Sequence, residues 1–203
     1  MSSCHTRSVW FFCTCSLTRR KAVPNGNLEG AVVVTGAGRG FGRAIAEELG
    51  HGGAKVVVNY SQSKGPAEDL VARLKQSGSP ESVAIGADVS DPAQAARLIE
   101  ETVKQFGRID VLVNNAGIIG FTRSATLELA RYNVTANVVA PGFTRSEMYE
   151  SIPGKTKVGI LAQIPLSRVC DHEEVARAVR FLVVDGDYIT GTTLNISWGI
   201  YLQ

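Results

Sequence analysis

One glycine-rich segment holds the residues whose types and spacing most clearly could do chemistry. Residues Thr35–Gly42 read T-G-A-G-R-G-F-G, and they join a β-branched stretch, Ala31–Thr35, to a helical pattern over Gly40–Leu49. Glycines let a backbone turn sharply and approach a phosphate closely. The helix that follows presents free N–H groups and the positive end of its dipole to an anion. Because a strand precedes the glycines and a helix follows them, the segment predicts a site for the pyrophosphate of a dinucleotide.

The residues around this turn favour one dinucleotide over another. The second predicted strand, Lys55–Asn59, runs into Tyr60 and Ser61, and no acid stands at that strand end to bond the ribose 2′-hydroxyl of NAD. Arg39, in the glycine segment, could instead hold a 2′-phosphate through a charge-assisted fork. The sequence therefore favours NADP(H) over NAD(H). An exposed loop arginine without a ligand is the alternative interpretation.

Predicted strands and helices alternate from Leu28 to near the end of the chain. Besides the strand at 31–35 and the helix at 40–49, the pattern predicts strands at 55–59, 82–85, 109–113, 134–139 and 192–196 and helices at 64–76, 92–106, 121–131 and 172–184. Asp91 is expected to cap one helix with Pro92 at its first position, and Asp171 and Glu174 are expected to form a capping box on another. Such alternation predicts an α/β fold: a three-layer, doubly wound parallel sheet, the Rossmann fold.

The first 27 residues differ from the rest in charge. Their only ionised side chains are Arg7, Arg19, Arg20 and Lys21, which gives +4 and leaves −2 on the remainder, for a net +2. We expect residues 1–27 to be a disordered extension and residues 28–203 to be one dinucleotide-binding domain. The basic, acid-free composition also fits an organellar transit peptide loosely, so a mitochondrial location stays open beside a cytoplasmic one.

Composition also limits the partners and the metal chemistry. A net charge as small as +2 does not favour nucleic acid as a partner. The apolar run at 9–13 is too short to span a membrane, so no membrane partner is expected either. The cysteines and histidines show no zinc-ligand spacing, and no metal site is predicted. His172 is expected to be a solvated side chain in the first turn of its helix.

Five short motifs in order along the chain resemble those of the short-chain dehydrogenases/reductases. The family's T-G-x-x-x-G-x-G matches Thr35–Gly42, and its D-V after the third strand matches Asp88-Val89. The remaining matches are N-N-A-G at Asn114–Gly117, P-G-x-x-x-T at Pro141–Ser146 with serine in place of the threonine, and I-T-G at Ile189–Gly191. The wording of the C-terminal third is similar to that of 3-oxoacyl-carrier-protein reductases and acetoacetyl-CoA reductases.

The resemblance implies an NADP(H)-dependent oxidoreductase that reduces a 3-oxoacyl or similar ketone. It implies a small-molecule ketone or alcohol as substrate, and homo-oligomers such as its relatives form. The implied cofactor contacts are Gly36, Arg39, Gly40, Phe41, Gly42, Asn59, Tyr60, Ser61, Asp88, Val89, Asn115, Ala116, Gly117, Pro141, Gly142, Thr144 and Ser146.

The family's catalytic segment has no counterpart here. Between Gly117 and Val134 the family pattern requires two helices and a strand carrying a serine and a Y-x-x-x-K pair, and the missing part is on the order of 60 residues at typical element lengths. Residues Ala116–Ile118 fit both edges of the gap, because A-G-I completes N-N-A-G-I and also begins the A-G-I-I-G-F-T-R-S wording that follows the catalytic lysine in relatives. Tyr60 and Lys64 match Y-x-x-x-K, but their place at the end of the second strand indicates a coincidence. We therefore predict no catalytic residues.

Three interpretations of the gap stay open. The chain is an oxidoreductase by descent that is inactive as written; or it is a non-catalytic, nucleotide-binding isoform; or its sequence is an incomplete gene model of an active reductase. In each case the lost helices are expected to leave apolar surface uncovered and to promote aggregation. The excision leaves strand, helix and strand in order, so the alternating fold is expected to survive it.

Overall fold

A computed structural model describes residues 14–19, 28, 30–114, 134–186 and 188–199. Its strands form one seven-stranded sheet. In order across the sheet these are β4 (Ser82–Gly86), β3 (Lys55–Tyr60), β2 (Ala31–Val34), β5 (Val111–Asn114), β1 (Thr14–Arg19), β6 (Val134–Pro141) and β7 (Thr193–Ile196). Every described pair that excludes β1 is parallel, which is the arrangement that the alternating pattern predicts.

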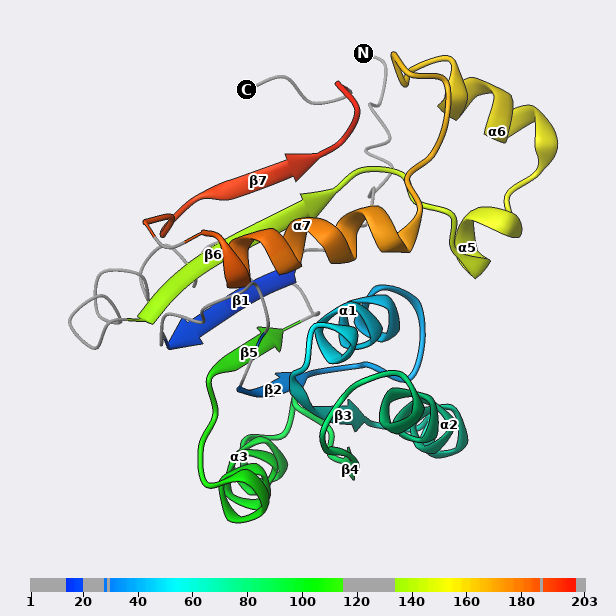
Figure 1. Cartoon of the computed structure of the whole chain (residues 1–203). Coiled ribbons are helices and arrows are strands. Elements are labelled where there is room, and N and C mark those ends of the chain that lie inside the picture. The colour runs from blue at the N-terminus through cyan, green and yellow to red at the C-terminus, as the bar shows by residue number, and fades with distance from the viewer. Residues whose placement is uncertain (1–13, 20–27, 29, 115–133, 187, 200–203) are drawn as a thin grey trace.

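Helices cover both faces of the sheet, so the molecule has three layers (Figure 1). The described helices are α1 (Gly40–His51), α2 (Lys64–Gln76), α3 (Pro92–Phe106), α5 (Glu147–Glu150), α6 (Gly154–Leu161) and α7 (His172–Val184). The larger core cluster joins α1, α2 and α7 to one face, with Val32, Val34 and Val139 among the strand residues in it. The smaller cluster packs Leu98 of α3 against Val33 and Val57 on the other face. The predicted doubly wound α/β fold is confirmed.

Burial explains why the central strands read as continuous apolar runs. All four residues of β2 are buried because helices cover both of their faces, and β3 is likewise buried from Val56 to Asn59. Amphipathic α1 places Ile45 and Leu49 in the core between the sheet and α7. The Asp91 side chain caps α3 by accepting from the N–H groups of Ala93 and Gln94, and α7 begins with the predicted capping box. The predicted helix at 121–131 lies outside the described residues.

Strand β1 differs from the disorder predicted for residues 1–27. Thr14–Arg19 pairs antiparallel with β5 on one side and with β6 on the other, so that Cys15 stands opposite Asn114 and Val138. This is the place between β5 and β6 where the strand of the missing segment would run. The physical reason is hydrogen bonding: a central slot exposes backbone N–H and C=O groups on two strands, and an extended segment satisfies both rows at once. Within the described part of the chain, no helix is long and apolar enough to cross a membrane.

Candidate cofactor site

The glycine segment turns at the carboxyl end of β2 with a backbone that requires glycine. Gly36 and Gly40 have φ values of +61° and +57°, in the left-handed region that side chains other than glycine rarely adopt. A Cβ atom on Gly42 would stand 2.5 Å from the carbonyl oxygen of Gly36, so the start of α1 could not approach the turn with a larger residue there. The turn therefore aims the free N–H groups at the start of α1 outward, as a phosphate site needs.

Asn59, at the end of β3, holds this turn in place. Its side-chain oxygen accepts from the N–H of Gly36 at 3.3 Å, and its side-chain nitrogen donates to the carbonyls of Ile85 and Ala87 at 3.2 and 3.0 Å. The residue is 2% exposed. Its polar atoms are thus used to tie the turn to β4. The sequence predicted Asn59 as a cofactor contact, whereas the structure shows it supporting the residues that would make the contact.

Arg39 stands at the position before α1 and extends into solvent. Its backbone is extended, with φ −157°, and its side chain makes no capping bond to the helix. Among the described residues none forms a hydrogen bond or ion pair with its guanidinium, whereas Arg43 one turn later pairs with Glu47 at 3.1 Å. Arg39 is therefore a cation available beside the predicted phosphate site.

The ends of β3 and β4 provide the surface beyond Arg39. Tyr60 packs its ring against Gly86, and Ser61 is exposed. The Asp88 carboxylate accepts from the hydroxyl and the N–H of Ser90 at 2.7 and 3.0 Å, and these bonds hold the pKa of Asp88 below its usual value. Val89 is 37% exposed. These four predicted residues lie on the same edge of the sheet as the glycine turn.

The loop after β6 closes the other end of this edge. The N–H of Gly142 donates to the carbonyl of Ile196 at 2.9 Å, and a Cβ on Gly142 would stand 3.1 Å from the Ser197 Cα. Thr144 is buried and forms a parallel bridge with Cys170. The Ser146 hydroxyl accepts from the N–H of Tyr149 at 3.2 Å and caps α5. Ser146 therefore has a structural use besides the cofactor contact predicted for it.

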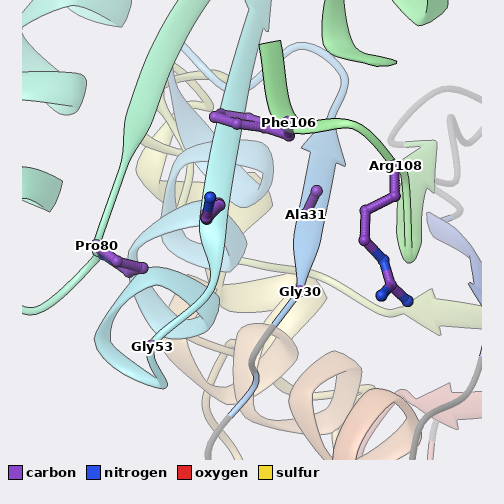
Figure 2. Close-up of a pocket in the computed structure, with 7 residues that line it drawn as sticks. Gly30, Ala31, Gly53, Pro80, Phe106 and Arg108 are labelled. Carbon is purple, nitrogen blue, oxygen red and sulfur yellow. The ribbon is translucent and has the colours of Figure 1, made fainter. Parts of the chain in front are cut away.

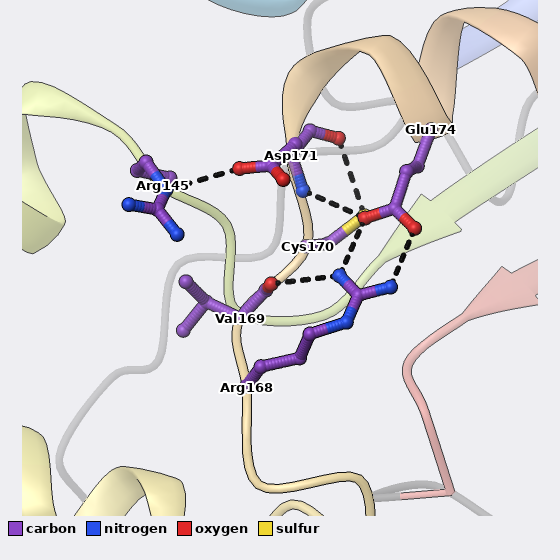
Figure 3. Close-up of polar contacts among 6 residues, drawn as sticks. All are labelled: Arg145, Arg168, Val169, Cys170, Asp171 and Glu174. Carbon is purple, nitrogen blue, oxygen red and sulfur yellow. Dashed lines mark hydrogen bonds and ion pairs between the residues drawn. The ribbon is translucent and has the colours of Figure 1, made fainter.

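Two ion pairs fasten this loop to the start of α7 (Figure 3). Arg145 donates to the Asp171 carboxylate at 3.0 Å, and Arg168 forms a fork with Glu174 at 2.7 and 2.8 Å. The hydrogen bond from Arg168 and a second one from the backbone of Asp171 lower the pKa of Glu174 to about 2. Burial raises the pKa of the neighbouring Cys170 thiol to about 11, so this thiol is protonated at neutral pH and is no nucleophile. The cluster is a structural anchor.

Asn115, Ala116 and Gly117, which the sequence predicted as further contacts, lie outside the described residues. Their neighbour Asn114 is described at the end of β5, where its side-chain oxygen accepts from the Thr35 hydroxyl at 3.2 Å. This bond links the glycine turn to the next parallel strand, at the point where the connections leave the sheet in opposite directions. Ligands of open α/β sheets bind at such a switch point.

A hollow of about 250 Å³ lies at the opposite, amino-terminal edge of the sheet (Figure 2). Gly30, Lys55, Phe106 and Arg108 contribute to its lining. Lys55 pairs with Glu81, and Arg108 pairs with Asp110, so both cations are already neutralised by a carboxylate. The hollow is remote from the glycine turn, and its charges give an anion no reason to bind.

Comparisons with known proteins agree with this geometry. The family described as short chain dehydrogenase matches residues 30–120, and the family described as enoyl-(acyl carrier protein) reductase matches residues 116–200. The chain is 33% identical to the 3-oxoacyl-[acyl-carrier-protein] reductase FabG of Staphylococcus aureus over 242 positions, which cover 85% of this chain and 98% of that protein.

This chain belongs to the short-chain dehydrogenase/reductase family.

Other members of the family are similar to the same extent. The 3-oxoacyl-[acyl-carrier-protein] reductase of Synechocystis is 33% identical over 241 positions, covering 84% of this chain and 96% of the relative. The FabG protein of Haemophilus influenzae is 31% identical over 241 positions, covering 84% and 98%. The chain is therefore an oxidoreductase of this family related to 3-oxoacyl reductases.

The sheet order separates the one Y-x-x-x-K match from the loop after β6. Tyr60 ends β3 and Lys64 begins α2, whereas Pro141–Ser146 follows β6. Four strand spacings lie between β3 and β6 in the sheet, or roughly 19 Å at about 4.8 Å each. A proton on the Tyr60 hydroxyl could not reach a carbonyl held near Pro141–Ser146, which agrees with the interpretation of the match as a coincidence.

Proposed function

We propose that this chain binds NADP(H) along the carboxyl edge of its sheet and does not turn over the 3-oxoacyl substrates that its relatives' names describe. The observation that carries the first half is the glycine turn, with its two positive φ values, supported from beneath by Asn59. The second half rests on the sequence, which has no serine and Y-x-x-x-K helix between Gly117 and Val134.

The preference for NADP(H) is supported by Arg39. A ribose bound beyond the glycine turn would place its 2′-substituent near the end of β3, where the side chains are those of Asn59, Tyr60 and Ser61. None of these is an acid that would repel a phosphate, and Arg39 supplies an unpaired guanidinium beside them. A guanidinium binds a phosphate through two parallel hydrogen bonds, which an uncharged 2′-hydroxyl cannot match.

The lack of turnover follows from the chemistry of ketone reduction. A bound NADPH would supply the hydride, and the developing alkoxide then needs a proton from a positioned acid. Tyr60 is too remote for this role, and the Cys170 thiol is buried in the anchor. Loss of a general acid costs about 10²–10⁴-fold in rate, and the groups that orient the carbonyl are missing as well. The residues present can bind a cofactor and do little more.

Alignment lengths support a deletion as the cause. The match to the Staphylococcus aureus relative spans 242 positions, whereas this chain has 203 residues, so at least 39 positions of the alignment have no residue here. The two family matches overlap at residues 116–120, where the shared A-G-I wording lies. A full-length transcript that encodes the missing segment would identify an active reductase behind an incomplete sequence. A transcript that joins these residues directly would identify a non-catalytic isoform. A cytoplasmic location remains a prediction from the sequence.

Equilibrium binding of NADPH and NADH to the full chain tests the cofactor proposal. The wild-type chain should bind NADPH saturably and NADH more weakly. Arg39→Ala should lower the affinity for NADPH about tenfold, equivalent to ~1.4 kcal/mol, and leave the affinity for NADH unchanged. Arg43→Ala is the matched control, because it removes a charge one turn away that already pairs with Glu47. Equal affinities of Arg39→Ala and Arg43→Ala for NADPH would contradict the assignment.

A further inference from the structure

His172, the first residue of α7, lies against the glycine turn although it is 130 residues away from it in the sequence. Its Nε2 atom stands 4.0 Å from the point that a Cβ on Gly40 would occupy. Its ring meets the ring of Phe41 edge to face, with the centroids 4.7 Å apart and the planes at 89°. The sequence predicted a solvated side chain, whereas the structure makes it half-buried beside the start of α1.

The carboxylates nearest in the chain are already bonded to other groups. Asp171 accepts from Arg145, and Glu174 accepts from Arg168 in a fork. Among the described residues, none forms a hydrogen bond with the His172 imidazole. The ring is therefore fixed by packing on Phe41, while its Nε2 atom faces the backbone of the turn with its hydrogen-bonding capacity unused.

Two helices begin at this place. The glycine turn leads into α1 at Gly40, and α7 begins at His172, so the positive ends of both helix dipoles meet beside Gly40. An anion bound by the free N–H groups of α1 would lie at the end of the helix that the imidazole Nε2 faces. An imidazole N–H is a suitable donor to a phosphate oxygen, and in its charged form it also adds a positive charge.

We propose that His172 is a cofactor-binding residue that donates a hydrogen bond from its imidazole to the pyrophosphate of the bound dinucleotide. This inference rests on the proposed function, since it requires the dinucleotide to bind at the glycine turn. It adds a contact from α7 to those of the turn itself. Because the pyrophosphate is common to both dinucleotides, His172 acts on NADPH and NADH alike, in contrast to Arg39.

Two substitutions separate hydrogen bonding from packing. His172→Phe keeps a ring against Phe41 and removes the donor, whereas His172→Gln keeps an N–H donor and removes the ring. We expect His172→Phe to weaken the binding of NADPH and of NADH about tenfold each with little change in Tm, and His172→Gln to bind both within about threefold of the wild type with a lower Tm. His51→Phe, at the far end of the same α1, is the matched control and should bind both as the wild type does.

The outcomes distinguish this inference from the proposed function. If the wild type binds both dinucleotides and His172→Phe binds them equally well, the inference is wrong and the proposed function stands. If His172→Phe loses affinity for NADPH alone, His172 acts on the 2′-phosphate, and the pyrophosphate assignment is wrong. If His172→Gln binds as weakly as His172→Phe, packing rather than the donor explains the effect. If the wild type binds neither dinucleotide, the proposed function fails and the inference fails with it.

Discussion

Glu174 shows how single residues hold the site in shape. Folding lowers the pKa of its carboxyl from the usual 4.5 to about 2, first because Arg168 bonds it and then because the Asp171 backbone does. Its contribution to stability is therefore complete above about pH 4.5 and is lost as the pH falls toward 2. We expect Glu174→Gln to lower the free energy of unfolding by about 1–2 kcal/mol at pH 7, and the deficit to shrink below pH 4.5.

Urea unfolding of this variant between pH 3 and pH 7 measures the effect. The exposed neighbour Glu173, on the same turn of α7, supplies the control Glu173→Gln. A deficit that stays constant over this pH range would mean that the Arg168 fork does not stabilise the fold.

Gly42 carries a second prediction at this scale. Its Cβ would stand 2.5 Å from a backbone oxygen, so Gly42→Ala must push the start of α1 away from the turn. We expect a loss of about 1–3 kcal/mol in stability and no measurable NADPH binding. Gly65→Ala is the control, because a Cβ there meets nothing within 4 Å and the substitution should stabilise α2 by up to about 1 kcal/mol. Normal NADPH binding by Gly42→Ala would contradict the geometry of the turn.

Strand β1 is the element that most distinguishes this fold. It replaces a missing parallel strand with an antiparallel one drawn from the N-terminal segment. Leu17→Pro removes one backbone N–H from the middle of the sheet and should lower stability by on the order of 3 kcal/mol. Leu17→Val keeps the N–H and should change stability little. Chemical denaturation of both variants tests the pairing, and equal stabilities would show that β1 does not lie in the sheet.

The sequence predicted the elements whose signals are local. The β-branched strands, the Asp91 cap and the Asp171 capping box fix their segments without reference to distant residues, and the structure has them at the predicted places. Strand β1 was missed because its place depends on a slot between β5 and β6 that no local pattern reveals. The alternation of Cys15 and Leu17 with hydroxyl residues was the available signal. Helix α6 was predicted as loop because it buries no residue and so has no apolar face to detect.

The candidate site was predictable only in part for the same reason. Glycine spacing identified the turn, because its backbone requirement is written in the sequence. The support given by Asn59 and the approach of His172 depend on which strand ends and helix starts meet in space. A buried asparagine at a strand end is compatible with either binding or support, and only its bonds to Gly36, Ile85 and Ala87 decide between them.

At the scale of the molecule, α3 has an apolar side without a described partner. Ile99 and Val103 are one turn apart on this helix and are 38% and 44% exposed. This agrees with the expectation that loss of two helices leaves apolar surface uncovered. We expect the double variant Ile99→Gln, Val103→Gln to stay monodisperse at concentrations at which the wild type aggregates, without change in NADPH affinity. Light scattering measures this, with Glu100→Gln as the control, and identical scattering of all three proteins would contradict it.

The central claim is that the molecule retains a cofactor-binding edge and has lost its catalyst. The most direct test mixes the full chain, saturated with NADPH, with a 3-oxoacyl thioester and follows the absorbance of NADPH through a single turnover. A FabG relative serves as the positive control. The account predicts that NADPH stays bound and unoxidised while the control oxidises it. Stoichiometric oxidation by this chain, at a rate within about 10²-fold of the control, would contradict the account and would require a proton donor that these residues do not supply.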